Sequence, residues 1–272
     1  MSAPGSDPPR PLAPALALAV AILGVGAMLA GPLGAQHLGL GFGLRAQVAL
    51  GTILLAIPAL GALVARKAAG RAAIGRGAVP LRTVLLSLLL GAALWVGSIG
   101  LMEIQSLVFP PSVETLDFFR RLHAALAPAG LLDGLVSLAV IALLPALCEE
   151  LVMRGALLPS LAANVGPAPA VFLTAAIFAG IHFDPIRLLF TFVLGLLLGL
   201  LRVRTRSLWP PVVVHSTLNA LTFFIAPLVD DPSQPYTPQP ALGLLCLVAG
   251  AAVAWPLLRA LRPSVDSPGG AA

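Results

Sequence analysis

Charged side chains are scarce in this chain. Only 10% of its 272 residues are Asp, Glu, Lys or Arg, whereas a soluble domain carries roughly 25%. The mean hydropathy is +0.99, and 58% of the residues are hydrophobic. So little polar surface excludes a water-soluble globular protein. Apolar runs long enough to cross about 30 Å of hydrocarbon recur along the chain, so we predict an all-α, polytopic membrane helix bundle.

Cysteines and basic patches are also rare. Cys148 and Cys246 both fall inside predicted helices, and we interpret them as small apolar packing residues. The net charge of +5 forms no basic stripe, because the arginines cluster at the ends of apolar runs. This pattern sets membrane orientation and does not indicate nucleic-acid binding.

The apolar runs predict about eight transmembrane helices. They cover approximately residues 12–30, 46–65, 81–102, 131–158, 168–182, 186–203, 209–228 and 241–258. The positive-inside rule then places both termini in the cytoplasm. An Ala-, Leu- and Arg-rich chain with almost no lysine is typical of a high-GC bacterium, which indicates the inner membrane.

One membrane-embedded domain accounts for most of the chain. We predict this domain over residues 12–262, with its motif core at about 131–228, and disordered tails at 1–11 and 263–272. Within residues 103–130, charged and apolar residues alternate as in a short amphipathic helix lying in the interface. Such a helix is either a solvated connection or a guide for substrate. His123 is expected in a loop and is assigned no role.

Close helix packing is predicted where small residues recur. Gly195 and Gly199 lie four positions apart in the sixth apolar run. This spacing lets helix backbones approach closely. Packing within the chain is the favoured interpretation, and dimerisation through this face remains open.

Three charged residues interrupt the fourth apolar run. Glu149, Glu150 and Arg154 lie where a charge costs about 3 kcal/mol or more to insert. Glu150 and Arg154 are four positions apart and can form a salt bridge on one helix face. Glu149 is rotated by about 100° from Glu150, so it is left without that partner. The charged cluster therefore contains one neutralised pair and one free carboxylate.

Three further polar residues stand in later apolar runs. His182 ends the fifth run, and His215 stands four positions before Asn219 in the seventh. We predict that these side chains meet Glu149 in one intramembrane site. Each group alone also has a structural interpretation, because membrane helices use His and Asn as interhelical hydrogen-bonding residues.

A free carboxylate, two imidazoles and a carboxamide suit hydrolysis. A carboxylate withdrawn from water is a stronger base than an exposed one, so Glu149 could take a proton from water and deliver it to a leaving amine. His and Asn side chains can donate hydrogen bonds to a developing oxyanion. Neither a serine nor a cysteine is obviously paired with the histidines, which disfavours a covalent intermediate.

Three motifs on separate predicted helices each contain two residues four positions apart: Glu149-Glu150-x-x-x-Arg154, Phe178-x-x-x-His182 and His215-x-x-x-Asn219. In this order they resemble the motifs of the CPBP family, over about residues 145–220. That family comprises the type II CAAX prenyl proteases and bacterial relatives, including bacteriocin-immunity-like proteins. The resemblance implies an eight-helix intramembrane endopeptidase that cleaves a membrane-proximal peptide or protein tail.

The resemblance also assigns roles to individual residues. It gives water activation to Glu149 and a structural or electrostatic position to Glu150 and Arg154. The oxyanion and water-binding positions fall on the three remaining polar residues.

His182 matches a histidine that holds the water, and His215 with Asn219 matches the pair at the oxyanion. The family was first described as metalloproteases, and Glu149, His182 and His215 could form a zinc site with an open position. However, the chain has no His-Glu-x-x-His motif, and Asn219 is a poor zinc ligand. We therefore predict no cofactor, with zinc as the alternative.

Two rival functions remain open. A non-catalytic immunity or partner-binding membrane protein would have the same fold. A small transporter could use buried carboxylates as a proton relay, although the chain lacks the repeat halves typical of transporters. The predicted partners are membrane lipid and a peptide or protein substrate, with or without a prenyl group, and the oligomeric state is left open.

Overall fold

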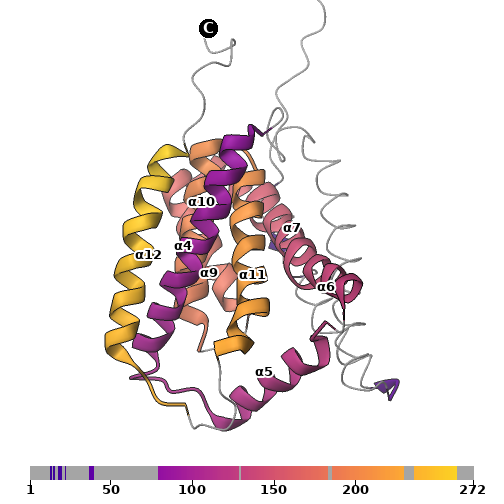
Figure 1. The fold of residues 1–272 in the computed structure, drawn as a ribbon. Helices are drawn as coiled ribbons and strands as arrows, with labels where there is room; N and C mark the ends of the chain where they lie inside the picture. The colour runs from indigo at the N-terminus through magenta and orange to yellow at the C-terminus, as the bar shows by residue number, and fades with distance from the viewer. Residues whose placement is uncertain are drawn as a thin grey trace, which may run out of the picture.

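The computed structural model describes residues 79–128, 130–182, 186–229 and 236–261, with a few isolated positions nearer the N-terminus. Every regular element within these ranges is a helix (Figure 1). This confirms the all-α prediction. The two apolar runs expected at 12–30 and 46–65 lie almost entirely outside the described residues, as do both predicted tails.

Six of the eight expected apolar runs coincide with helices. The described elements are α4 (Leu81–Gln105), α5 (Val113–Leu126), α6 (Leu131–Ser137), η1 (Leu138–Leu143), α7 (Leu144–Glu150), η2 (Leu151–Leu157), α8 (Leu158–Val165), α9 (Pro167–Gly180), α10 (Leu188–Thr205), α11 (Trp209–Val229) and α12 (Pro240–Ala260). The five elements from α6 to α8 follow one another without a break, and we call them the long helix.

Four helices of the described ranges are long and apolar enough to cross a membrane: Leu81–Gln105, Leu131–Val165, Leu188–Thr205 and Pro240–Ala260. The protein is therefore an integral membrane protein with a helical bundle. The count of about eight spans stays a prediction. α9 is a shorter apolar helix of 14 residues, and two expected spans fall outside the described ranges.

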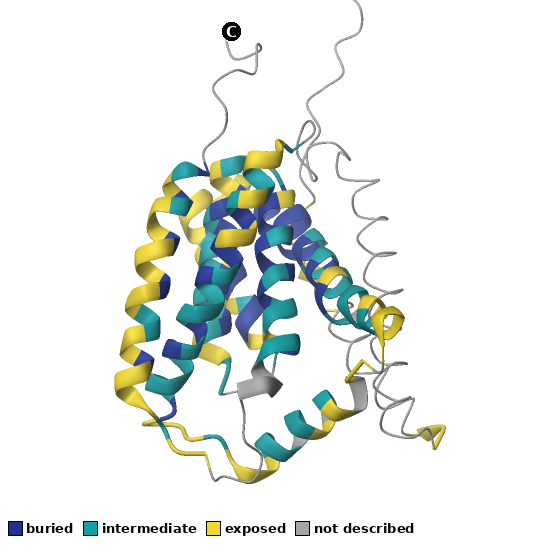
Figure 2. Cartoon of the chain, in the orientation of Figure 1, coloured by how far each residue is buried: buried dark blue, intermediate teal, exposed yellow. Residues whose placement is uncertain are grey.

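The helices form a bundle in which α4 lies between α12 and α11 (Figure 1). α10 packs along α9 and also contacts α11, and the long helix packs against α11 through η1 and α7. Buried residues gather where these helices meet, whereas the outward side of α12 is exposed (Figure 2). That exposed side is apolar, as expected of a face that meets lipid.

Close approach of α9 and α10 depends on two glycines. A Cβ added to Gly195 would lie 2.9 Å from the Ala175 Cα, and one added to Gly199 would lie 3.0 Å from Val171 Cγ1. Both contacts are within the chain. The predicted packing through small residues is thus confirmed.

The long helix departs from regular α-helical geometry twice, each time before a proline. The Leu144 N–H donates to Ala139 O just before Pro145, and the Leu158 N–H donates to Met153 O just before Pro159. Proline has no N–H to donate and crowds the preceding turn. We attribute both π-type turns to this, because a wider turn accommodates the proline ring without ending the helix.

The long helix also runs further than its apolar pattern predicted. It ends at Val165 rather than near residue 158, and the turn into α9 is the single residue Gly166 with φ 84°. Pro167 lies in the first turn of α9, where a missing N–H costs nothing. The connection between the two helices is therefore shorter than the gap between the predicted runs 131–158 and 168–182.

α5 confirms the short amphipathic helix. Ser112 caps it by accepting a hydrogen bond from the Thr115 N–H at 3.2 Å. The expectation that His123 lies in a loop is wrong, because this residue belongs to α5 and its ring centroid is 5.6 Å from that of Phe223 in α11. The Arg187 guanidinium lies 4.9 Å from the ring centroid of Phe119. These ring contacts attach α5 to the bundle.

Candidate active site

The centre of the candidate site is a fully buried ion pair. Arg154 Nη1 donates to Glu150 Oε1 at 2.7 Å, and both side chains have 0% exposure. Arg154 Nη2 donates to Gly195 O at 2.9 Å, which ties the long helix to α10. The salt bridge predicted from the four-residue spacing is confirmed. Removing one partner would leave the other charge buried without compensation, which costs about 3–5 kcal/mol.

His215 of α11 contacts this pair, and its contact with Glu150 fixes the tautomer of the imidazole. His215 Nδ1 lies 3.0 Å from Glu150 Oε1, the oxygen that also accepts from Arg154. An ionised carboxylate only accepts hydrogen bonds, so Nδ1 carries the proton. The other ring nitrogen, Nε2, lies 3.8 Å from Glu149 Oε2. One imidazole thus stands between the two glutamates.

The two adjacent glutamates have different environments. Glu150 is fully buried and holds Arg154 and His215 through Oε1, while its Oε2 has no hydrogen-bond partner among the described residues. The Glu149 side chain is 16% exposed, and its Oε2 is buried with no hydrogen-bond partner among the described residues. The predicted division into one paired and one free carboxylate is therefore present. An unpartnered buried carboxylate oxygen is costly, which makes it a natural place for a water or a ligand.

Phe178 connects the second histidine to the cluster. Its buried ring has centroid distances of 4.9 Å to His182 and 5.7 Å to His215, and both contacts are edge-on. The Arg154 Cζ lies 4.7 Å from the same ring centroid. The ring therefore separates the two imidazoles and excludes water from the guanidinium. The sequence marked Phe178 only by its spacing to His182, and this packing role was not predicted.

His182 lies just beyond α9, half-buried, and its Nδ1 is 2.7 Å from Phe178 O. Since a carbonyl only accepts, Nδ1 donates there, and Nε2 of the neutral ring is left as an acceptor. None of its hydrogen bonds reaches Glu149 or Glu150 within the part of the chain that the structure describes. His182 approaches the cluster through Phe178 rather than directly.

Asn219 is one turn beyond His215 on α11, as its spacing predicted, and it is half-buried. Within the described ranges, no hydrogen bond joins it to the other site residues. The structure thus brings Glu149, Glu150, Arg154 and His215 into one cluster, places His182 behind Phe178, and leaves Asn219 on the same helix as His215.

A second buried arginine supports the cluster and was missed. Arg202, near the end of the sixth apolar run, was given no role in the site, but it lies within α10 and is only 9% exposed. Its Nε donates to Arg154 O at 3.3 Å, in the π-type segment η2. A signal was present, because Gly195, Gly199 and Arg202 follow one face of α10 at spacings of four and three. Cys148 is fully buried and free, in keeping with a packing role.

The positions of the site residues also show whether these side chains could hold a metal ion. Within the described ranges, no three His, Cys, Asp or Glu side chains gather closely enough to hold a metal ion. Of the three predicted zinc ligands, His182 is separated from His215 by the ring of Phe178. The residues as placed do not fit the zinc site considered above, so we derive no step through a metal.

The fold and the site define an integral membrane protein with a buried Glu-Glu-Arg-His cluster. Residues 131–221 match the family model described as "Type II CAAX prenyl endopeptidase Rce1-like". This confirms the resemblance to the CPBP family over that segment, which begins with α6 and contains all six candidate residues. Over these residues the chain is similar to a family named for endopeptidase activity. Neither a curated protein nor a solved structure matches the chain.

Proposed function

We propose that the protein is an intramembrane endopeptidase that hydrolyses a peptide bond in a membrane-proximal peptide or protein tail. The observation that carries this proposal is the difference between the two glutamates. Each glutamate has one unbonded carboxylate oxygen, but Glu150 is fully buried and neutralised by Arg154, whereas Glu149 is partly exposed and faces His215. A base must have a free lone pair in reach of its water, and Glu149 meets this condition.

Charge balance supports a shared proton. Glu150 and Arg154 cancel, which leaves Glu149 and His215 as the ionisable remainder of the cluster. A single proton held by either of them makes the cluster neutral, and a neutral cluster is favoured where water is excluded. This proton can move between Glu149 Oε2 and His215 Nε2, which lie 3.8 Å apart, either directly or through a water.

In the proposed reaction, Glu149 takes a proton from a water whose oxygen bonds to the carbonyl carbon. The carbonyl oxygen gains the electron pair and becomes an oxyanion. The C–N bond then breaks, and the proton passes from Glu149 to the leaving nitrogen, so atoms and charges balance. Glu149 is regenerated as a carboxylate.

The remaining polar groups suit the other positions. A neutral His182 presents Nε2 as an acceptor, which fits a group that holds the attacking water. His215 can donate from Nε2 only when protonated, so the shared proton makes it an oxyanion donor. Asn219, one turn away, offers a carboxamide N–H to the same oxygen.

The chemistry of this cluster acts on the amide bond and does not itself require a prenyl group. The matched family is named for CAAX prenyl substrates. For this chain we propose the broader class of membrane-proximal tails, with both termini of the enzyme in the cytoplasm. A comparison of prenylated and unprenylated peptides of one sequence then tests whether the lipid contributes to the specificity constant kcat/KM.

The decisive experiment replaces Glu149 by Gln, which preserves shape and removes the base. Terminal peptides of cells expressing the wild type, Glu149→Gln and the control Glu114→Gln are compared by mass spectrometry. Glu114 lies in the first turn of α5, outside the cluster. We expect new peptide ends in the wild type and control that are absent in Glu149→Gln at equal protein level. Their persistence in Glu149→Gln would refute catalysis by this glutamate and favour the immunity or binding function.

A further inference from the structure

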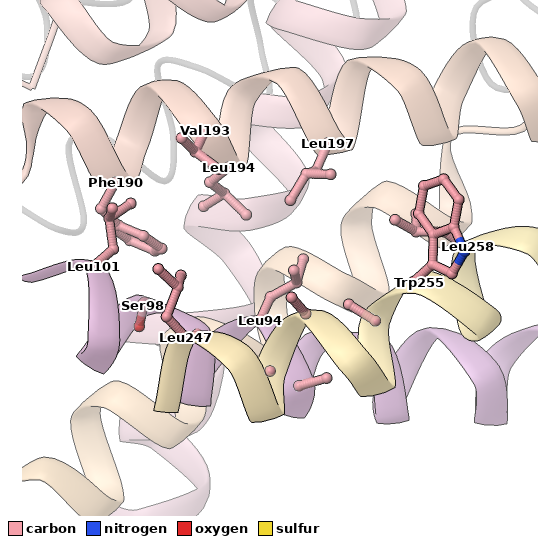
Figure 3. Close-up of a pocket in the computed structure, with 15 residues that line it drawn as sticks. Leu94, Ser98, Leu101, Phe190, Val193, Leu194, Leu197, Leu247, Trp255 and Leu258 are labelled. Atoms are coloured by element: carbon pink, nitrogen blue, oxygen red, sulfur yellow. The ribbon is translucent and has the colours of Figure 1, made fainter. Parts of the chain in front are cut away.

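A cavity of about 240 Å³ lies between α4, α10 and α12, away from the glutamate cluster (Figure 3). None of the six candidate site residues lines it. Apart from the indole N–H of Trp255, Ser98 carries the single polar side-chain group among the described lining residues, and its hydroxyl already donates to Trp95 O at 2.6 Å. The cavity is therefore apolar, and water gains no hydrogen bonds by filling it.

The cavity is long and runs along the helix axes. On α12 it extends from Leu247 to Leu258, a rise of about 16 Å at 1.5 Å per residue. This is about half of the ~30 Å hydrocarbon core, the depth of one leaflet. Its dimensions are therefore those of a single acyl chain lying parallel to the helices.

One end of the cavity carries an aromatic ring and a cation. Trp255 lines the cavity, is 58% exposed and lies near the end of α12. The Arg259 guanidinium, one turn further on, lies 4.6 Å from its ring centroid. Arg259 is exposed, and no ion pair is formed by it within the described ranges. Trp and Arg at a helix end are the residues that anchor at the headgroup level.

We propose that this cavity binds one acyl chain of an anionic glycerophospholipid whose phosphate lies against Arg259. The chain enters beside Trp255 and runs between α4, α10 and α12 towards Leu247. The guanidinium supplies two N–H groups to the phosphate oxygens. A headgroup with a net negative charge is attracted to this cation more strongly than a zwitterionic headgroup of zero net charge. This inference rests on the membrane placement of α4, α10 and α12 and is independent of the peptidase proposal.

The test uses tryptophan quenching by brominated lipids in bilayers of unlabelled phosphatidylcholine. The full chain carries Trp95→Phe and Trp209→Phe, so that Trp255 is the remaining tryptophan of the three. Brominated phosphatidylglycerol and brominated phosphatidylcholine are added at equal, low mole fractions. We expect about fivefold stronger association of the anionic probe, which corresponds to about 1 kcal/mol for one cation near an anionic headgroup. Arg259→Gln abolishes this preference, and Arg259→Lys retains it.

Two neighbouring alanines on α12 provide a matched pair for the cavity itself. Ala251 lines the cavity and Ala252 does not, and both are exposed. Ala251→Leu fills the cavity and reduces quenching of Trp255 to the bulk-lipid value, whereas Ala252→Leu leaves it unchanged. The Arg259 comparison does not depend on these variants folding.

Three results would overturn the proposal. If quenching follows the bulk mole fraction of the brominated lipid in the Trp95→Phe, Trp209→Phe protein with Arg259 intact, the cavity selects no lipid. Quenching below the bulk value means that protein, either a second copy or another segment of this chain, covers the cavity. An equal effect of Ala251→Leu and Ala252→Leu means that the acyl chain lies elsewhere.

Discussion

Glu150 and His215 are 65 residues apart in the chain, yet Glu150 Oε1 lies 3.0 Å from His215 Nδ1. This contact gives Glu150 the part of a positioning residue. It holds His215 in the tautomer whose Nε2 faces Glu149, as a carboxylate commonly orients an imidazole. In the proposed reaction, Glu150 therefore orients His215 and Glu149 transfers the proton.

Glu150→Gln should destabilise the fold by about 3–5 kcal/mol, because it leaves the buried Arg154 charge uncompensated. The double variant Glu150→Gln/Arg154→Met should lose less than Glu150→Gln alone, since it removes both charges. Denaturant unfolding in detergent measures the four corners of this cycle, and we expect a coupling of about 3 kcal/mol or more, because each single variant leaves one buried charge uncompensated. Additive losses would show that the two side chains do not interact.

Gly195→Ala should destabilise the protein by about 1–3 kcal/mol, because the new methyl group would lie 2.9 Å from the Ala175 Cα. The backbone shift that relieves this contact also moves the carbonyl that accepts from Arg154, so activity should fall as well. Gly180→Ala is the control. Its methyl would meet nothing within 4 Å, and helix propensity predicts a gain of up to about 1 kcal/mol. Equal unfolding midpoints for the two variants would contradict the close packing of α9 and α10.

Pro159→Ala should raise the stability of the fold and lower the activity. An N–H at position 159 can donate to Gly155 O, which favours a regular α-turn in place of η2 and removes a proline cost of about 3 kcal/mol. The fold should gain stability, while rotation of the Arg154 turn against Glu150 should lower peptide-cleaving activity by tenfold or more. The matched control is Pro256→Ala, inside α12 and away from the cluster, which should retain activity. Full activity in Pro159→Ala would show that the wider turn does not position the cluster.

Tyr236 is the single tyrosine of the chain, so its phenolate absorbance can be followed directly. Partial burial raises the pKa of Tyr236 and Glu103 adds to the increase, against an opposing effect of the hydrogen bond to Ser106 at 2.9 Å. We expect an alkaline midpoint above that of the unfolded chain, which is near pH 10. Glu103→Gln should lower the midpoint.

The same shift has a defined sign for stability. Because the folded state holds the Tyr236 proton more tightly, its contribution is fully present below the unfolded pKa of about 10. It is lost as the pH rises through the folded value. Tyr236→Phe should flatten this alkaline decline in unfolding experiments. A midpoint equal to that of the denatured chain would contradict the contact between the segment at 236–239 and the end of α4.

Local patterns were sufficient for much of the fold. Apolar runs predicted six of the described helices, and the four-residue spacing predicted the ion pair of Glu150 with Arg154. Both depend on short-range geometry that the sequence states directly. The π-type turns were missed, although Pro145 and Pro159 signalled them, because a regular periodicity was assumed across each proline.

Contacts across the bundle were harder to predict. Arg202 was given no role although it donates to Arg154 O, and His123 was assigned to a loop although it packs against Phe223. In each case the partner lies on another helix. Which faces of two helices meet depends on side-chain shape along their whole length, and composition alone does not contain it.

The sequence by itself determined that this is a helical membrane protein, that it carries three polar motifs, and that one of two adjacent glutamates is paired. Hydrophobicity and helical spacing decide these features before any tertiary contact forms. Only the tertiary structure decided that His215 stands between Glu149 and Glu150, that Phe178 separates the two histidines, and that Arg202 supports the cluster. Those relationships arise because helices distant in the chain pack closely enough to exclude water, so that each buried polar group must find its partner on a neighbouring helix.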